Sequence, residues 1–130
     1  MDYTVELDEK QFETMENILA KELMEVGVQS LLLIDLAGNI LISLNDGKAR
    51  HDVYSLAALA AGNFGAVSEI AKIIGETDFS LLFHKGEKES IHFSRVADDL
   101  LLITVFGKEV SLGFLRLKVA EVIKKITALL

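Results

Sequence analysis

The histidines are the side chains in this sequence best suited to metal binding or proton transfer, so their spacing is decisive. The chain has three, His51, His84 and His92, and the last two flank a turn over Lys85–Lys88. Two antiparallel strands joined by that turn could place His84 opposite His92. The chain contains no cysteine, and no carboxylate stands at metal-ligand spacing from these histidines. We therefore expect strand-surface histidines and no metal site.

A glycine-containing stretch, AGNFGAVS at residues 61–68, is the next candidate because glycine-rich segments can hold phosphates. It lacks the Gly-Lys-Ser/Thr of a P-loop and lies inside a predicted helix, not between a strand and a helix. Asp98 and Asp99 fit a turn better than a catalytic pair, and no serine has the context of a nucleophile elbow. Arg95 and Arg116 could reach a nucleotide phosphate, but surface arginines are the simpler interpretation. The sequence predicts no catalytic residues, no cofactor, and a protein that is not itself an enzyme.

The middle of the chain, from about residue 52 to residue 74, is predicted to form a helix with one side made of small residues. Its bulky apolar side is expected to face a sheet: Leu56, Leu59, Ala60, Val67, Ile70 and Ile74. Ala58, Gly62 and Gly65 lie on the opposite side, where small residues let another backbone approach. Phe64 is expected on the flank between the two sides, half exposed. Glycine costs about 1 kcal/mol relative to alanine inside a helix, so we favour a packing surface for a second helix; simple tolerance of the glycines is the alternative.

The elements that position this helix can be predicted from hydrophobic periodicity. Apolar residues recur every three or four positions in two further helices, at residues 8–26 and 111–129. Apolar runs bounded by turn residues predict five strands, at residues 28–34, 39–44, 79–84, 89–96 and 100–106. Strands joined by short turns are antiparallel, and the runs at 28–34 and 100–106 are apolar on both faces. The sequence therefore predicts one domain over residues 1–130, with central strands covered by helices on both sides.

Composition and charge narrow the classes of partner. The net charge is −7, which argues against nucleic acid and anionic membranes as ligands. The apolar runs look too short for the roughly 20 residues of a membrane span, so we expect no membrane insertion and a cytoplasmic location. Residues 1–26 hold eight acids and two bases, whereas residues 108–130 hold five bases and two acids. We favour attraction between the first and last helices lying side by side, and a charged partner site is the alternative.

Four segments in order resemble the Roadblock dynein light-chain domain family. They are LLLIDLAGNIL, LAALAAGNFGAVSEIAKIIGE, FHKGEKESIHF and LLLITVFGKEVSLGFLRLKV, and the resemblance covers roughly residues 8–130. The likeness is strongest to bacterial MglB-type GTPase-activating proteins. It implies an α+β fold of the order α-β-β-α-β-β-β-α. The five-stranded antiparallel sheet would carry the first and last helices on one face and the middle helix on the other.

The resemblance also implies partners. Such proteins form homodimers by pairing their middle helices and third strands, and they bind a small Ras-like GTPase of the MglA type. They stimulate GTP hydrolysis by holding the switch regions, without inserting an arginine. A dimer or GTPase interface on the middle helix would then involve the following residues: Ala57, Ala58, Ala61, Gly62, Phe64, Gly65 and Ser68.

Two alternatives to a GTPase activator remain at this point. Related Roadblock proteins act as scaffolds or adaptors in GTPase and motor complexes, and the quoted motifs do not separate the two roles. A small-molecule sensor would need a pocket, whereas the many Leu, Ile and Val residues look sufficient to fill the core. Some relatives continue past the last helix with a tail implicated in nucleotide exchange, and this sequence ends at Leu130, so we expect no exchange activity.

Overall fold

The structure of the protein, a computed structural model, describes residues 7–48, 50–77 and 82–130. The elements in chain order are α1 (Glu9–Leu19), a π-helical turn η1 (Ala20–Met24), β1 (Val28–Asp35), β2 (Ile40–Asn45), α2 (Val53–Ile73), β3 (Leu82–Lys85), β4 (Glu89–Val96), β5 (Leu100–Gly107) and α3 (Leu112–Thr127). The predicted order of helices and strands is confirmed. Part of the predicted third strand, at 79–81, lies outside the described residues.

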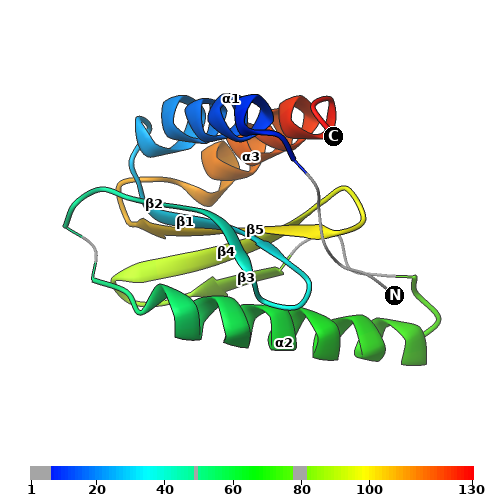
Figure 1. The fold of residues 1–130 in the computed structure, drawn as a ribbon. Helices are drawn as coiled ribbons and strands as arrows, with labels where there is room; N and C mark the ends of the chain where they lie inside the picture. The colour runs from blue at the N-terminus through cyan, green and yellow to red at the C-terminus, as the bar shows by residue number, and fades with distance from the viewer. Residues whose placement is uncertain (1–6, 49, 78–81) are drawn as a thin grey trace.

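The sheet separates two unequal helical layers. Its five strands run in the order β2-β1-β5-β4-β3, and every neighbouring pair is antiparallel. Helices α1 and α3 lie side by side on one face, and α2 lies alone along the other (Figure 1). The predicted α+β fold, with two helices against one face and one against the other, is confirmed. Strand β3 forms one edge of the sheet.

Alternation along the central strands explains why helices cover both faces. In β1, Leu31 and Leu33 belong to the core beneath α1 and α3, whereas Leu32 and Ile34 belong to the core beneath α2. Successive side chains of a strand point to opposite faces, so a continuous apolar run needs cover on both. All eight residues of β5 are buried. The prediction of doubly covered central strands is confirmed.

The outer helices begin and end at sequence signals. The carboxylate of Asp8 accepts the backbone N–H of Gln11 at 2.7 Å, and the Gln11 side chain accepts the Asp8 N–H at 2.9 Å, which completes a capping box. The Ser111 hydroxyl caps α3 by accepting the N–H of Phe114 at 3.2 Å. Gly27 ends the first helical segment with a φ of +111°, a conformation that favours glycine. The predicted helix over residues 8–26 is α-helical only as far as Leu19.

The turn between β1 and β2 fixes the position of α2. The Asp35 carboxylate accepts the N–H groups of Ala37 at 3.0 Å and Asn39 at 2.8 Å, which holds the turn closed. Between them, Gly38 has a φ of +93°, and a Cβ there would lie 3.3 Å from the Cα of Ala58. The turn therefore rests directly on the backbone of α2, at the N-terminal end of the predicted interface.

Candidate functional site

The side of helix α2 that faces the sheet overlaps the predicted one only in part: Ala60 is buried and Leu56 packs against the core, as predicted. Its buried residues are Ala57, Ala60, Phe64 and Ala71. Three residues predicted against the sheet are instead exposed, at 73% for Leu59, 53% for Ile70 and 65% for Ile74. For these three residues the prediction was wrong because α2 is apolar around most of its circumference, so periodicity alone cannot select a face. Small alanines on the inner side let the helix backbone lie close to the sheet.

The seven predicted interface residues divide between the two sides of α2. Ala57 and Phe64 are buried, at 0% and 7% exposure, so they are not accessible to a partner. The expectation that Phe64 is half exposed was therefore wrong. The Arg95 guanidinium carbon lies 5.6 Å from the centroid of the Phe64 ring, and this contact anchors α2 to β4. The others are partly or fully exposed: Ala61, Ser68, Ala58, Gly62 and Gly65.

The solvent side of α2 carries a stripe that we call the outer stripe, formed by Leu59, Gly62, Ala66, Ile70 and Ile73. These residues follow one another at spacings of three and four, so they lie along one line of the helix. A Cβ built on Gly62 would meet no atom within 4 Å, and the same holds for Gly65. Packing within the described subunit therefore does not require glycine at either position.

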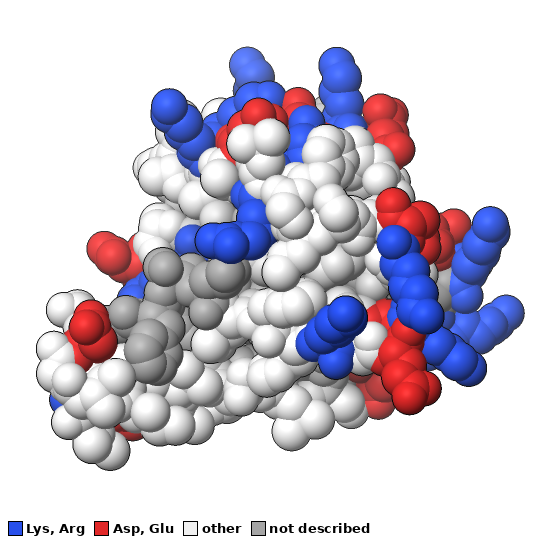
Figure 2. All heavy atoms as spheres, turned by 180° about the vertical axis from the view of Figure 1, so that it is seen from behind, with Lys and Arg blue, Asp and Glu red and all other residues white. Residues whose placement is uncertain are grey.

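Large apolar side chains gather on this helix. Eight are exposed among the described residues, and five belong to α2 or its end: Tyr54, Leu59, Ile70, Ile73 and Ile74. The surface along the lower margin of Figure 2, where α2 lies, is mostly uncharged. A contiguous apolar patch is typical of a protein interface. By length and composition alone α2 is also long and apolar enough to cross a membrane, since its 21 residues include an 18-residue window with a mean hydropathy of 1.2.

Strand β3 supplies a second surface suited to self-association. Its four described residues pair with β4, in register from Leu82 opposite Phe93 to Lys85 opposite Ser90. No other described strand pairs with β3. An edge strand presents unpaired N–H and C=O groups that another strand can bind.

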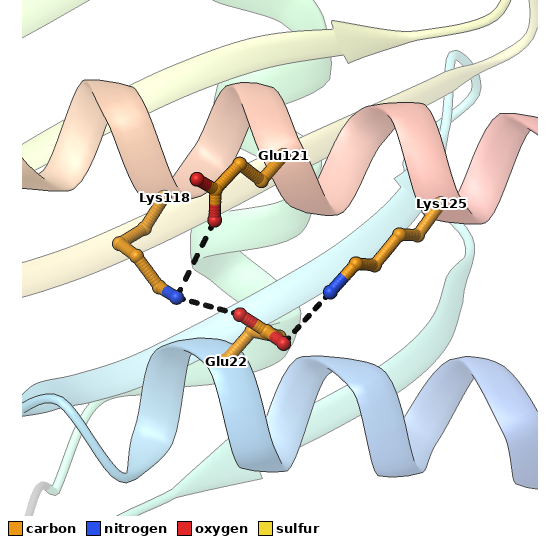
Figure 3. A network of polar contacts seen from close by, with 4 residues as sticks. All are labelled: Glu22, Lys118, Glu121 and Lys125. Carbon is orange, nitrogen blue, oxygen red and sulfur yellow. Dashed lines mark hydrogen bonds and ion pairs between the residues drawn. The ribbon is translucent and has the colours of Figure 1, made fainter.

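On the opposite layer of the molecule, a network of ion pairs links the first and last helical segments. The Glu22 carboxylate accepts hydrogen bonds from the Nζ of Lys118 at 2.6 Å and from the Nζ of Lys125 at 2.8 Å (Figure 3). A carboxylate oxygen of Glu121 lies 3.5 Å from the Nζ of Lys118. Hydrogen bonds from the two lysines lower the pKa of Glu22 to about 2. The predicted attraction between the acidic first helix and the basic last helix is confirmed. These charges therefore join η1 to α3.

The histidines do not form the pair considered from the sequence. His92 lies opposite Phe83 in the register of β3 and β4, so His84 projects to the other face of the sheet. His84 is exposed, whereas His92 is 1% exposed, so the expected surface position of His92 was wrong. Across residues 7–48, 50–77 and 82–130, no three His, Cys, Asp or Glu side chains are grouped to hold a metal.

Sequence reasoning missed a third polar arrangement, around His51. Its Nδ1 lies 2.8 Å from the Ser30 hydroxyl, and its Nε2 lies 3.0 Å from a Glu89 carboxylate oxygen. A serine, a histidine and an acid in line suggest a hydrolase, but Ser30 is a residue of β1 and only 2% exposed, so its hydroxyl is closed to a substrate. The arrangement instead ties the segment before α2 to strands β1 and β4.

The class of protein to which this fold belongs is shown by a match to a family model. The family model described as the Roadblock/LC7 domain matches residues 15–106, and the chain belongs to this family. None of the curated proteins compared with the chain matches it.

Solved structures place the chain among MglB-like members of that class. The gliding protein MglB from Thermus thermophilus is 27% identical with a TM-score of 0.89, over 99% of this chain and 97% of that one. A structure described as MglB with tetrameric arrangement is 26% identical with a TM-score of 0.89, over 99% and 96%. Myxococcus xanthus MglB is 29% identical with a TM-score of 0.83, over 90% and 94%.

Proposed function

We propose that this protein is a homodimeric regulator of a small Ras-like GTPase of the MglA type and that it stimulates GTP hydrolysis. The outer stripe on α2 is the observation that carries the proposal. Its exposed leucine and isoleucines need a covering partner, and Gly62 lets a helix approach closely. The similarity to MglB structures supports a GTPase regulator in particular.

The homodimer would use both unpartnered surfaces of the subunit. Two copies related by a two-fold axis present the same patch to each other, so one apolar stripe can cover its own counterpart. Pairing of two β3 edges would join the sheets beside the paired helices. The revised interface keeps Ala58, Gly62 and Gly65 of the residues expected from the sequence, and adds Leu59 and Ile70.

The GTPase would bind the surface made by the two α2 helices and be stimulated through its own catalytic groups. A regulator that binds the hydrolysis-competent conformer more tightly than other conformers shifts the population toward it. None of the three arginines of the chain, Arg50, Arg95 and Arg116, belongs to the outer stripe, which favours a mechanism without an arginine finger. The Arg95 guanidinium donates to the Asp98 carbonyl at 2.8 Å and covers Phe64, and Arg116 belongs to α3 on the other face of the sheet. A GTPase of this class would place the protein in the cytoplasm.

The test is single-turnover GTP hydrolysis by the Ras-like GTPase encoded in the same genome, with and without an excess of this protein. Gly62→Arg places a charged side chain on the outer stripe, where the subunit leaves open space. Gly113→Arg is the matched control, because Gly113 is also an exposed helix glycine with open space but lies in α3.

We expect wild type and Gly113→Arg to accelerate hydrolysis, and Gly62→Arg to lose the effect while keeping its circular dichroism spectrum. If the protein binds the GTPase regardless of the bound nucleotide and does not accelerate hydrolysis, the scaffold alternative is favoured and the proposed activator role is overturned. If Gly62→Arg and Gly113→Arg accelerate hydrolysis equally, the outer stripe is not part of the interface.

A further inference from the structure

We infer that a cleft between the β3–β4 hairpin and the start of α3 docks an acidic segment of a partner protein, with an aromatic side chain of that segment as the anchor. The volume of the cleft is about 490 Å³. The residues on which the argument depends are Phe83, Lys85, Lys88, Phe106, Lys108 and Leu112. Phe106 belongs to the core beneath α1 and α3, so the cleft opens on the face of the sheet opposite α2. The inference is therefore independent of the proposed GTPase interface on the outer stripe.

The floor of the cleft is aromatic. The ring centroids of Phe83 and Phe106 lie 6.1 Å apart, and the ring planes are inclined by 20°, so the two rings are stacked. Phe106 is buried, whereas Phe83 lies on the edge strand and is partly exposed. Leu112 at the start of α3 is also partly exposed and forms part of the apolar wall. An aromatic side chain that enters the cleft can stack on Phe83 and bury apolar surface that the subunit leaves open.

The rim of the cleft carries three lysines. In the register of the sheet Lys85 pairs with Ser90, and Ser90 pairs with Phe106, so these three side chains share one face. Lys88 in the hairpin turn and Lys108 after β5 line the same cleft. All three lysines are exposed, and none of them forms an ion pair with another residue of the described part of the chain.

The acidic residues closest in sequence do not neutralise this rim. Glu89 points to the α2 face, where its carboxylate lies 3.0 Å from the Nε2 of His51. Glu109 lies at that face too, because one of its carboxylate oxygens is 2.6 Å from the position of a Cβ built on Gly107. Glu87 is exposed in the hairpin turn and does not line the cleft. The cleft is therefore a local positive site on a chain with a net charge of −7, which favours an acidic ligand.

The arrangement of the lysines favours a peptide segment over a single carboxylate. They come from the end of β3, from the hairpin turn and from the loop after β5, so they surround the aromatic floor. A segment with acids on both sides of one aromatic residue can place a carboxylate near more than one lysine while its ring fills the centre. A buried aromatic anchor within a charged rim is a common arrangement in protein recognition.

The experiment titrates the 15N-labelled full chain with the peptide acetyl-Glu-Glu-Phe-Glu-Glu-amide and follows the backbone amide signals of Phe83, Phe106 and Lys108. Replacing the phenylalanine of the peptide by alanine tests the anchor, and replacing its four glutamates by glutamine tests the charge. We expect saturable shifts with the first peptide and binding weaker by roughly tenfold with each of the others. Equal binding of the alanine peptide, shifts confined to α2, or no saturable shift would each overturn the inference.

Paired lysine variants distinguish a site from diffuse attraction. Lys85→Gln combined with Lys108→Gln should weaken binding of the first peptide roughly fourfold to ninefold, because each exposed ion pair accounts for about twofold to threefold. Lys21→Gln combined with Lys124→Gln removes the same charge from exposed positions outside the cleft and should leave binding within about twofold. The inference is also overturned if the two double variants weaken binding equally.

Discussion

Replacing Leu59 by alanine should dissociate the dimer without unfolding the subunit. Leu59 is 73% exposed and lies in the outer stripe. Alanine removes three carbon atoms, each contributing about 0.8 kcal/mol when buried. Scaled by the exposed fraction that a second copy could cover, this gives about 1.7 kcal/mol for each subunit. Because a two-fold interface contains Leu59 twice, the dimer would lose about 3.5 kcal/mol, which raises the dissociation constant roughly 300-fold.

Sedimentation equilibrium over a concentration series measures that constant directly. Leu117→Ala is the matched control, because Leu117 is 59% exposed on α3 and should leave the dimer unchanged. Both variants should unfold within about 0.5 kcal/mol of wild type when monomeric, as surface substitutions do. A dissociation constant for Leu59→Ala equal to that of Leu117→Ala would refute the placement of Leu59 between the subunits.

Three further predictions concern stability, measured by urea unfolding. Phe64→Ala should cost about 3 to 5 kcal/mol, since Phe64 is buried between α2 and the sheet; a loss below about 1 kcal/mol would contradict its inner position. Because the pKa of Glu22 is lowered from 4.5 to about 2, its stabilising effect is complete above pH 4.5 and is lost as the pH falls toward 2; Glu22→Gln should lack this loss. The pKa of His92 is lowered from 6.5 to about 4, so the unfolded chain binds the extra proton. Stability should therefore decrease as the pH is lowered from 6.5 to 4, and His92→Gln should flatten that slope.

Local signals in the sequence were sufficient for most of the fold. Asp8 followed three residues later by Gln11 is a capping signal, and the structure shows both of its hydrogen bonds. The segment ESIHFSRV is β4 with the predicted ends. The apolar runs in β1 and β5 required cover on both faces, which left few arrangements for three helices. These features depend on neighbouring residues, so one sequence is enough to predict them.

Two features of the sites depend on packing between distant segments. In β4, His92 alternates with Ile91 and Phe93, which suggests a solvent-facing histidine. Only the placement of α3 over β4 buries it, and that placement is not encoded within the strand. The inner face of α2 likewise depends on the β1–β2 turn, where Gly38 meets the helix backbone.

Helix α2 buries mainly small side chains against the sheet and exposes large apolar ones on its outer surface. A helix of 21 residues buries four side chains in the subunit, and three of them are alanines, which contribute little apolar area. Several large side chains, among them Leu59, Ile70 and Ile73, point away from the sheet. A partner covering them would therefore stabilise α2 in its observed position as well as bind it. By mass action, the stability of this helix should then rise with protein concentration, while that of the α1–α3 layer should respond much less.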